Sequence, residues 1–370
     1  MNVCHICSNY DSFYIDFMEQ QLLEGLDFRV FYFRAKERGL PNVEASYLDV
    51  RLNYRNWHRL LFHLKERIVL KDFLNLYENT DFDLYHAHTL FSNGYIALEA
   101  KKRWNKPYIV AVRDVDVNVF FKYQIHLRSL GLQILNEAEK IVYLSESYLD
   151  LMNSKYIPEN LQAEFSSKSS IIPNGINSFF LKNKYYRDEL DEQSSLNIIT
   201  VGYLSKRKNQ LAVCEAIKSL NESGIKTTYT VIGKVLDEDI LDKINGYHFV
   251  KYIPFLSRED LIKEYRKADI YVMPSMTETF GLTYAEAMTQ GLPVIYTKGQ
   301  GFDKQFEEGV VGYSVDGKDI FDIKSRILDI KRNYKDISYN SYKLCDKFNW
   351  EDITKEYMDI YSNVKYANKK

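Results

Sequence analysis

The sequence predicts an α/β protein built from two doubly wound domains. Short apolar runs of strand length alternate with longer segments whose apolar residues recur at helical spacing. This alternation stops near residue 180 and starts again near residue 196, and 370 residues are enough for two separate cores. Because alternating strands and helices form a parallel sheet with helices on both faces, we expect the same unit twice.

Runs of apolar residues in the first half predict its strands, and helical patterns such as Trp57-Leu61-Leu64-Ile68 fill the gaps between them. The strands are expected at 2–7, 28–33, 84–86, 108–112, 140–144 and 170–173. The second half predicts five more strands, at 197–201, 227–232, 249–252, 270–273 and 294–297.

The domain limits follow from a polar stretch without periodicity. We expect an N-terminal domain over 1–180, a linker over 181–195 and a C-terminal domain over 196–347. The carboxyl ends of both sets of strands are expected to face a crevice, which is where doubly wound folds bind ligands.

Charge and composition exclude several classes of protein. The formal net charge of −2 gives no basic field for nucleic acid. No run of 18 apolar residues and no signal-peptide pattern occurs, so a cytoplasmic protein is expected. Cys4-x-x-Cys7 has no second cysteine pair and lies in the first predicted strand, where buried structural thiols are expected.

The strongest local signal is the segment from Pro274 to Met288, which leaves an apolar strand, passes through a glycine loop and enters a helix near Leu282. A helix N-terminus offers free N–H groups and a positive dipole end, which suit a diphosphate. Glu278 lies in the loop and Glu286 lies one turn inside the helix. The two carboxylates can therefore bind different parts of one extended ligand.

The whole string resembles the Glu-x7-Glu signature of glycosyltransferase family 4, here Glu278 to Glu286, together with the Gly-x-Pro-Val-Ile strand that follows it. Upstream, Val201–Asn209 is similar to that family's strand–loop–helix phosphate motif, with Lys208 in the place of its diphosphate-binding lysine. Many members have arginine where this chain has Tyr203, and Arg207 or Lys206 are alternatives for the missing charge.

The resemblance implies a GT-B fold with two Rossmann-like domains facing a cleft and a C-terminal helix, 348–370, that crosses back to the N-domain. It implies a retaining transferase that moves a hexose from a nucleotide-diphosphate sugar to a glycan or lipid-linked acceptor, without a metal or other cofactor. Lys208 and the helix N-terminus would stabilise the diphosphate, Glu286 would hold the ribose and Glu278 the hexose. The donor-binding set implied in this way is Gly202, Arg207, Lys208, Phe280, Gly281, Leu282 and Glu286.

The N-domain departs further from the family pattern. His86-Ala87-His88 ends a strand and suggests either a metal or, as in the family, residues that border the cleft. Arg113 stands where the family has a histidine, whereas Asp116 keeps the family's acid. Asp116 and His88 are therefore expected to help on the acceptor side, together with the catalytic Glu278.

Alternative functions compete with this interpretation. A metal-dependent GT-A transferase would use Asp114 and Asp116, and a sugar-nucleotide epimerase would share the fold but need no acceptor. A dinucleotide oxidoreductase would use Gly299-Gln300-Gly301, but Lys304 stands at its third glycine position. A sugar-nucleotide sensor without catalysis is a fourth alternative.

A basic segment suggests where the enzyme acts. The spacing predicts a helix over 51–71 with Arg51, Arg55, Arg59, Arg67 and Lys71 four residues apart or multiples of four. Such a helix can attract anionic lipids at the inner face of the cell membrane, although a solvated basic face is the alternative. Richness in Tyr and Asn is typical of A/T-rich bacterial genomes, in which such enzymes often build surface polysaccharides.

Overall fold

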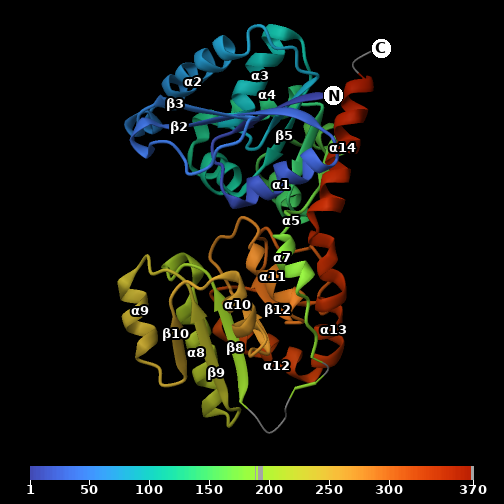
Figure 1. Ribbon diagram of the computed structural model, residues 1–370. Coiled ribbons are helices and arrows are strands. Elements are labelled where there is room, and N and C mark those ends of the chain that lie inside the picture. The colour runs from blue at the N-terminus through green and yellow to red at the C-terminus, as the bar shows by residue number, and fades with distance from the viewer. Residues whose placement is uncertain (188, 191–194, 368–370) are drawn as a thin grey trace. The chain divides into compact units, whose positions relative to one another are not determined.

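The computed structural model describes residues 1–187, 189–190 and 195–367. Its contacts divide the chain into two units, each a parallel sheet with helices on both faces (Figure 1). The first unit contains Met1–Leu144, Tyr148–Ile172 and the segment that starts at Trp350, and the second contains Ser145–Ser147 and Pro173–Asn349. The doubly wound class predicted from the alternating pattern is confirmed in both halves.

The first unit has a seven-stranded parallel sheet in the order β3-β2-β1-β4-β5-β6-β7. Helices α2, α3 and α4 cover one face, while α1 and α14 pack on the other (Figure 1). The strands are β1 Asn2–Cys7, β2 Asp27–Ala35, β3 Leu48–Tyr54, β4 Leu84–Ala87, β5 Tyr108–Val112, β6 Lys140–Tyr143 and β7 Ser169–Ile171. The helices are α1 Ser12–Leu23, α2 Phe62–Leu76, α3 Ser92–Trp104, α4 Arg128–Glu137, α5 Glu146–Lys155, α6 Glu159–Ser167 and α14 Trp350–Ala367.

Short helical turns connect several of these elements: η1 Lys36–Arg38 after β2, η2 Asn56–Leu60 after β3, and the π-helical turn η3 Asp116–Phe121 with η4 Ile125–Leu127 after β5. All of them follow the carboxyl ends of strands. Because the strands are parallel, these turns lie at one edge of the sheet.

The second unit has a six-stranded parallel sheet in the order β10-β9-β8-β11-β12-β13. Its strands are β8 Leu196–Val201, β9 Thr227–Ile232, β10 Val250–Ile253, β11 Ile270–Val272, β12 Val294–Thr297 and β13 Gly312–Val315. Its helices are α7 Ser178–Lys182, α8 Gln210–Glu222, α9 Glu238–Asn245, α10 Arg258–Tyr265, α11 Leu282–Thr289, α12 Ile320–Arg332 and α13 Tyr334–Leu344, with turns η5 Lys206–Lys208 and η6 Cys345–Phe348.

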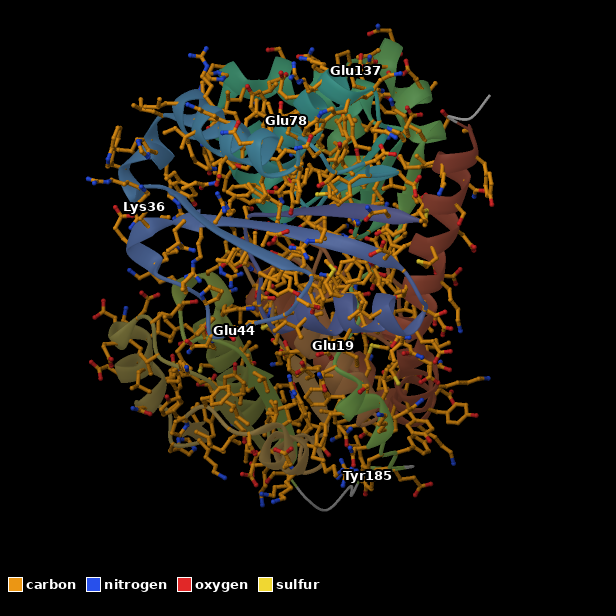
Figure 2. All side chains as sticks on the ribbon, turned by 45° about the horizontal axis from the view of Figure 1, so that its top comes forward. Glu19, Lys36, Glu44, Glu78, Glu137 and Tyr185 are labelled. Atoms are coloured by element: carbon orange, nitrogen blue, oxygen red, sulfur yellow. The ribbon has the colours of Figure 1, made fainter. Side chains whose placement is uncertain are left out.

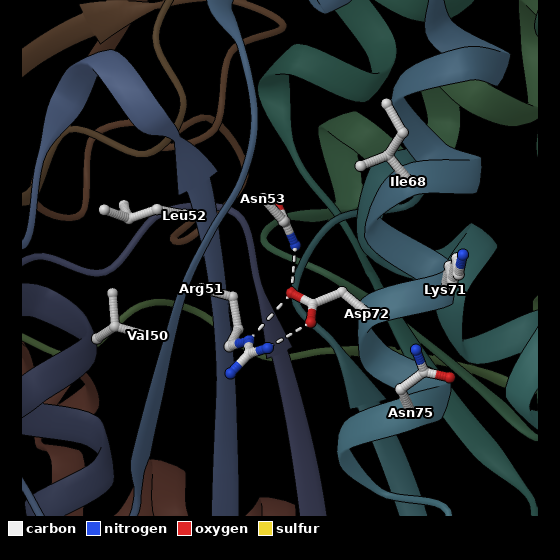
Figure 3. Close-up of a pocket in the computed structure, with 8 residues that line it drawn as sticks. All are labelled: Val50, Arg51, Leu52, Asn53, Ile68, Lys71, Asp72 and Asn75. Carbon is white, nitrogen blue, oxygen red and sulfur yellow. Dashed lines mark hydrogen bonds and ion pairs between the residues drawn. The ribbon is translucent and has the colours of Figure 1, made fainter.

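The predicted basic helix over 51–71 is wrong. Residues 51–54 end the edge strand β3, 56–60 form η2, and α2 starts only at Phe62. Asp72 binds the Arg51 guanidinium, with Nε at 3.0 Å, and also accepts from Asn53, in a groove of about 510 Å³ between β3 and α2 (Figure 3). Arg51 is therefore a residue of strand β3 whose charge is paired with Asp72 of α2, and it is not part of a helical row of cations.

The remaining boundaries differ by small amounts. The C-terminal helix starts at Trp350 instead of 348, and Trp350 packs in the first unit against Phe17, with ring centroids 5.1 Å apart. The contacts assign Pro173–Lys182 to the second unit, whereas the predicted N-domain extended to 180. Of the expected linker over 181–195, residues 188 and 191–194 lie outside the described part of the chain, as do 368–370 of the terminal helix.

Candidate functional site

The second unit gathers most of the predicted donor-binding residues around the start of α11. Gly202 follows β8, and a Cβ added to it would lie 3.4 Å from Lys208 Cε, so the lysine side chain passes close over the glycine. Asn209, in the left-handed conformation, donates to the carbonyls of Pro274 and Gly317 at 3.0 and 2.6 Å. These bonds fix the end of η5 beside the loop that carries Glu278.

Lys208 and Glu278 form a buried ion pair, with Lys208 Nζ 2.5 Å from Glu278 Oε2. The Ser275 hydroxyl donates to the same oxygen at 3.2 Å. Burial lowers the pKa of Lys208, while the Glu278 carboxylate acts in the opposite direction. The predicted phosphate lysine and the predicted sugar-binding glutamate are thus brought together.

Arg207 lies beside this pair and Lys206 does not. The Arg207 guanidinium donates to the Thr277 carbonyl at 2.7 Å and lies 3.8 Å from Glu278 Oε2. The Lys206 side chain is exposed, and its backbone N–H donates to Asp237. Of the two alternatives for the charge missing at Tyr203, the geometry favours Arg207.

The N-terminus of α11 is shaped by Gly281. Its φ is +79°, and a Cβ there would lie 2.3 Å from the Tyr284 ring, so only glycine fits this turn. Phe280 is buried, whereas Leu282 at the helix start is half-buried. The first backbone N–H groups of an α-helix have no partner within the helix, so this end can bind an anion.

Glu286 lies one turn inside α11. The Tyr265 hydroxyl donates to Glu286 Oε2 at 3.4 Å. Burial raises the pKa of Glu286 to about 7, against a small opposing effect of that hydrogen bond. Near neutral pH this carboxyl can therefore change its charge when a ligand binds.

Gly299-Gln300-Gly301 braces the Glu278 loop, a role that sequence reasoning missed. Glu278 N–H donates to Gln300 Oε1 at 2.9 Å, and Gly301 N–H donates to the Glu278 carbonyl at 3.2 Å. A Cβ on Gly301 would lie 1.8 Å from the Thr279 carbonyl oxygen. The glycine after β12 therefore permits close backbone approach and does not belong to a dinucleotide fingerprint.

In the first unit, Asp116 is fully buried and binds backbone amides. Its carboxylate accepts from the N–H groups of Leu90, Phe91 and Arg113 at 3.2 Å or less. Burial raises the pKa of Asp116 to about 6, which these backbone bonds partly oppose. The carboxylate thus ties the loop after β4 to the loop after β5.

His88 is buried with two other histidines. His88 Nε2 lies 2.9 Å from His5 Nδ1, and the His86 and His88 rings stack with centroids 4.0 Å apart. His86 Nδ1 lies 2.7 Å from the hydroxyl of Tyr361 on α14. Sequence reasoning missed His5 because its place in an apolar strand gave no signal.

Within the described part of the chain, these three histidines form the one group of metal-ligating side chains close enough to share an ion. The group includes no carboxylate or thiolate, and the charge of Arg113 adds to burial in lowering the pKa of His86 and His88. The lowered pKa values keep His86 and His88 uncharged near neutral pH. The cluster fits a neutral hydrogen-bonded network that joins α14 to β1 and β4.

Two family descriptions match consecutive parts of the chain. Residues 16–178 match Glycosyltransferase Family 4, and residues 183–344 match Glycosyl transferases group 1. A probable sucrose-phosphate synthase of Thermosipho melanesiensis is 30% identical over 220 residues, 56% of this chain but only 50% of that relative. Alpha-monoglucosyldiacylglycerol synthase of Acholeplasma laidlawii is 25% identical over 269 residues, 66% of this chain and 67% of that relative.

Solved structures share the fold over nearly the whole chain. Sucrose-phosphate synthase from Thermosynechococcus elongatus has a TM-score of 0.78 at 17% identity, covering 99% of each chain. HepE of Anabaena in complex with UDP has a TM-score of 0.73 at 14% identity, covering 98% of this chain and all of that chain. The two family matches, the named relatives and the two parallel-sheet units together show that the chain is a glycosyltransferase of the family 4 type with the GT-B fold.

Proposed function

We propose that the enzyme transfers a hexose from a nucleotide-diphosphate sugar with retention of anomeric configuration. The observation that carries this proposal is the Lys208–Glu278 pair at the N-terminus of α11. Lys208, Arg207 and the helix N-terminus would hold the diphosphate, and Glu286 would accept hydrogen bonds from the ribose. The donor would lie close to the backbone at Gly202, which has no side chain, and at the loop Phe280–Leu282.

In the proposed reaction, the bond between the anomeric carbon and the diphosphate oxygen breaks while the acceptor oxygen bonds to the same face of the sugar. The acceptor proton passes to a phosphate oxygen, and the positive charges of Lys208 and Arg207 stabilise the leaving diphosphate. Glu278 would hold the hexose next to the reacting carbon. Support for a nucleotide donor comes from HepE, which has the same fold and was solved with UDP.

Metal independence is part of this proposal. Two cationic side chains, Arg207 and Lys208, lie beside Glu278, and with the helix N-terminus they would neutralise the diphosphate in place of a divalent cation. Transfer should therefore proceed in EDTA. Loss of activity on chelation, with recovery on addition of Mn²⁺, would instead favour a metal-dependent transferase.

We assign His88 and Asp116 to the acceptor side as positioning residues. Both side chains are buried, and Asp116 fixes the loops after β4 and β5 through backbone amides. Arg113 joins them, since its Nε donates to the His88 carbonyl at 3.3 Å. These residues would set the shape of an acceptor-binding edge.

The proposed acceptor is a glycan or lipid-linked sugar in bacterial surface polysaccharide synthesis, used by a cytoplasmic enzyme at the inner face of the cell membrane. Alpha-monoglucosyldiacylglycerol synthase, a relative matched over two thirds of its length, is named for a lipid product. None of the helices in the described ranges has both the length and the apolar character of a membrane span. Nucleic acid is not an expected partner, because the net charge is −2.

A panel of UDP-, GDP- and ADP-sugars tests the proposed function. One donor should raise the melting temperature of the enzyme in EDTA and then give a product whose anomeric proton reports the donor's configuration by NMR. An inverted product would contradict retention. A donor converted to its epimer without any acceptor would favour the epimerase alternative.

A further inference from the structure

Exposed apolar side chains collect at the carboxyl edge of the first unit's sheet. Leu60 is 87% exposed, Tyr123 69%, Ile125 65% and Trp57 51%, although residues of these types are usually buried. They lie in the turns that follow β3 and β5 and at the start of α2. The full set, called the carboxyl-edge surface below, is Leu40, Trp57, Leu60, Leu61, Leu64, Val119, Tyr123 and Ile125.

Contacts join the three segments that carry this set. Asn56 N–H on η2 donates to Glu37 on η1 at 3.0 Å. The Phe62 ring at the start of α2 meets the Phe120 ring of η3, with centroids 5.7 Å apart. Lys36 of η1 lies at the outer edge of the first unit (Figure 2). The apolar side chains therefore belong to one region and are not scattered singly over the unit.

The region is also basic. Between residues 55 and 71 the sequence has Arg55, Arg59, Lys65, Arg67 and Lys71, and Glu66 is the only acid. Glu66 is buried and its carboxylate is bound by Lys65 at 2.7 Å, so the two charges offset each other below the surface. Residues 117–136 contain Lys122 and Arg128 and no acid. The exposed charge around the apolar side chains is thus predominantly positive.

We propose that the carboxyl-edge surface inserts into an anionic lipid surface. Apolar and aromatic side chains flanked by arginines and lysines suit the boundary between lipid head groups and acyl chains. The cations attract anionic head groups, while the apolar side chains leave water. The proposal deepens the proposed function, since it places the acceptor-side edge where a lipid-linked acceptor would be found.

The carboxyl-edge surface differs from the predicted basic helix in how it would bind lipid, because apolar side chains contribute as well as cations. Attachment by a row of cations alone would be lost when salt screens the charges. A surface with exposed Trp57, Leu60 and Tyr123 should keep part of its binding in salt, because burial of apolar area is not screened. The two contributions can therefore be measured separately.

Sedimentation with vesicles tests the proposal on the full chain. Wild type should pellet strongly with phosphatidylcholine vesicles containing about one third phosphatidylglycerol, and much more weakly with phosphatidylcholine alone, to which only the apolar side chains contribute. Reversing Arg55, Arg59 and Arg67 to Glu should weaken partition at least about 100-fold, since each cation is worth roughly fivefold. Reversing three exposed lysines of the second unit, Lys243, Lys318 and Lys331, changes the net charge equally and should leave partition within about threefold.

The contribution of the apolar side chains to vesicle binding is tested by separate variants and by Trp57 fluorescence. Trp57→Ser with Leu60→Ser should abolish the binding that remains at about 0.5 M salt, whereas Phe321→Ser, at an exposed site on α12, should not. Trp57 fluorescence should shift to the blue and be quenched by brominated lipid. The proposal would be overturned if Trp57 emission did not shift when the protein was bound to vesicles. It would also be overturned if the control variants in the second unit lost as much vesicle binding as the carboxyl-edge variants. A stable dimer in solution that shields Trp57 and does not bind vesicles would likewise overturn it.

Failure of this proposal can be told from failure of the proposed function. Donor binding depends on Lys208 and Glu286 in the second unit, and the carboxyl-edge variants leave both residues in place. They should keep the wild-type thermal shift with the donor sugar. A protein that binds donor but never binds anionic vesicles would remain a transferase and would refute insertion alone.

Discussion

Lys208 and Glu278 form a buried ion pair, with 2.5 Å between ammonium and carboxylate. Each of the two residues thus contacts the other, and each is also proposed to bind part of the donor, Lys208 the diphosphate and Glu278 the hexose. In the proposed function, a diphosphate bound by Lys208 would compete with Glu278 for the ammonium, and the carboxylate would then be free to bind the sugar. The pair compensates the charges of two buried side chains.

A double-mutant cycle tests this relationship. Lys208→Met alone leaves the Glu278 carboxylate buried beside Arg207 and should destabilise the second unit by about 2–4 kcal/mol. Adding Glu278→Gln should recover most of that loss, because the unpaired charge is gone. Both single variants and the double variant should turn over at least about 100-fold more slowly. Chemical denaturation and steady-state rates measure the two effects; additive losses of stability would show that the pair is not coupled.

Donor affinity should depend on pH through Glu286. Its pKa of about 7 in the free enzyme means that the carboxyl is largely protonated below neutrality. Since ribose hydroxyls donate to the ionised form, donor binding should strengthen as pH rises towards about 8 and weaken up to about tenfold per unit below 7. Glu286→Gln should remove this dependence and weaken binding at high pH. A donor titration at several pH values measures it, and an unchanged profile in Glu286→Gln would assign the titration elsewhere.

The brace formed by Gln300 and Gly301 should act on turnover more than on binding. Gln300→Leu removes the acceptor for the Glu278 N–H, and Gly301→Ala pushes a methyl group towards the Thr279 carbonyl. We expect kcat to fall about tenfold or more while the donor KM stays within about threefold, because Glu278 addresses the reacting sugar. Lys298→Ala, at an exposed neighbouring position, is the control. Equal losses in kcat and donor affinity would mean that the loop serves donor binding as a whole.

The buried histidines should make the first unit sensitive to acid. Burial lowers the pKa of His5 to about 3 and lowers the pKa of His86 well below its ordinary value near 6.5. The unfolded chain takes up protons as pH falls below 6.5, and the folded chain does not. The free energy of unfolding should therefore be greatest above pH 6.5 and fall by about 1.4 kcal/mol per pH unit for each such histidine as the pH drops below 6.5.

Urea unfolding of the first unit at pH 7 and 5 measures this slope. His5→Leu should reduce the slope by the contribution of one histidine, whatever its effect on stability at pH 7. His248→Asn, at an exposed site of the second unit, should leave the slope unchanged. The same slope in wild type and His5→Leu would contradict the neutral network.

The sequence predicts the interior strands of both sheets and two of the four edge strands, β7 and β10. Central strands such as β1 and β12 are continuous apolar runs buried on both faces, and their predicted limits match the structure. The edge strands β3 and β13 are missed, because polar residues or glycine interrupt their apolar residues and leave no continuous apolar run. In β3, the spacing of the arginines was mistaken for a helix, although Arg51 pairs with Asp72 across the groove.

The candidate site could be predicted where its residues are close together in the sequence. Glu278, Glu286 and the start of α11 are local in the chain, so a short motif contains them. Gln300 and His5 act through contacts with residues about 20 or more than 80 positions away, and no local spacing records such contacts. The acceptor-side role predicted for Asp116 stays a prediction, and only the structure shows that its carboxylate accepts hydrogen bonds from three backbone amides.

Calorimetric titration of the nucleotide-sugar panel in EDTA tests the central claim most directly, which is that the second unit binds a nucleotide-sugar donor through Lys208 and Glu286. One donor should bind with one site per chain, and Lys208→Met and Glu286→Ala should each weaken it at least about tenfold, or about 1.4 kcal/mol. Lys206→Ala, whose exposed side chain lies outside the pair, should bind as wild type does. Donor binding that is unchanged in both site variants, or no binding of any sugar nucleotide, would contradict the account.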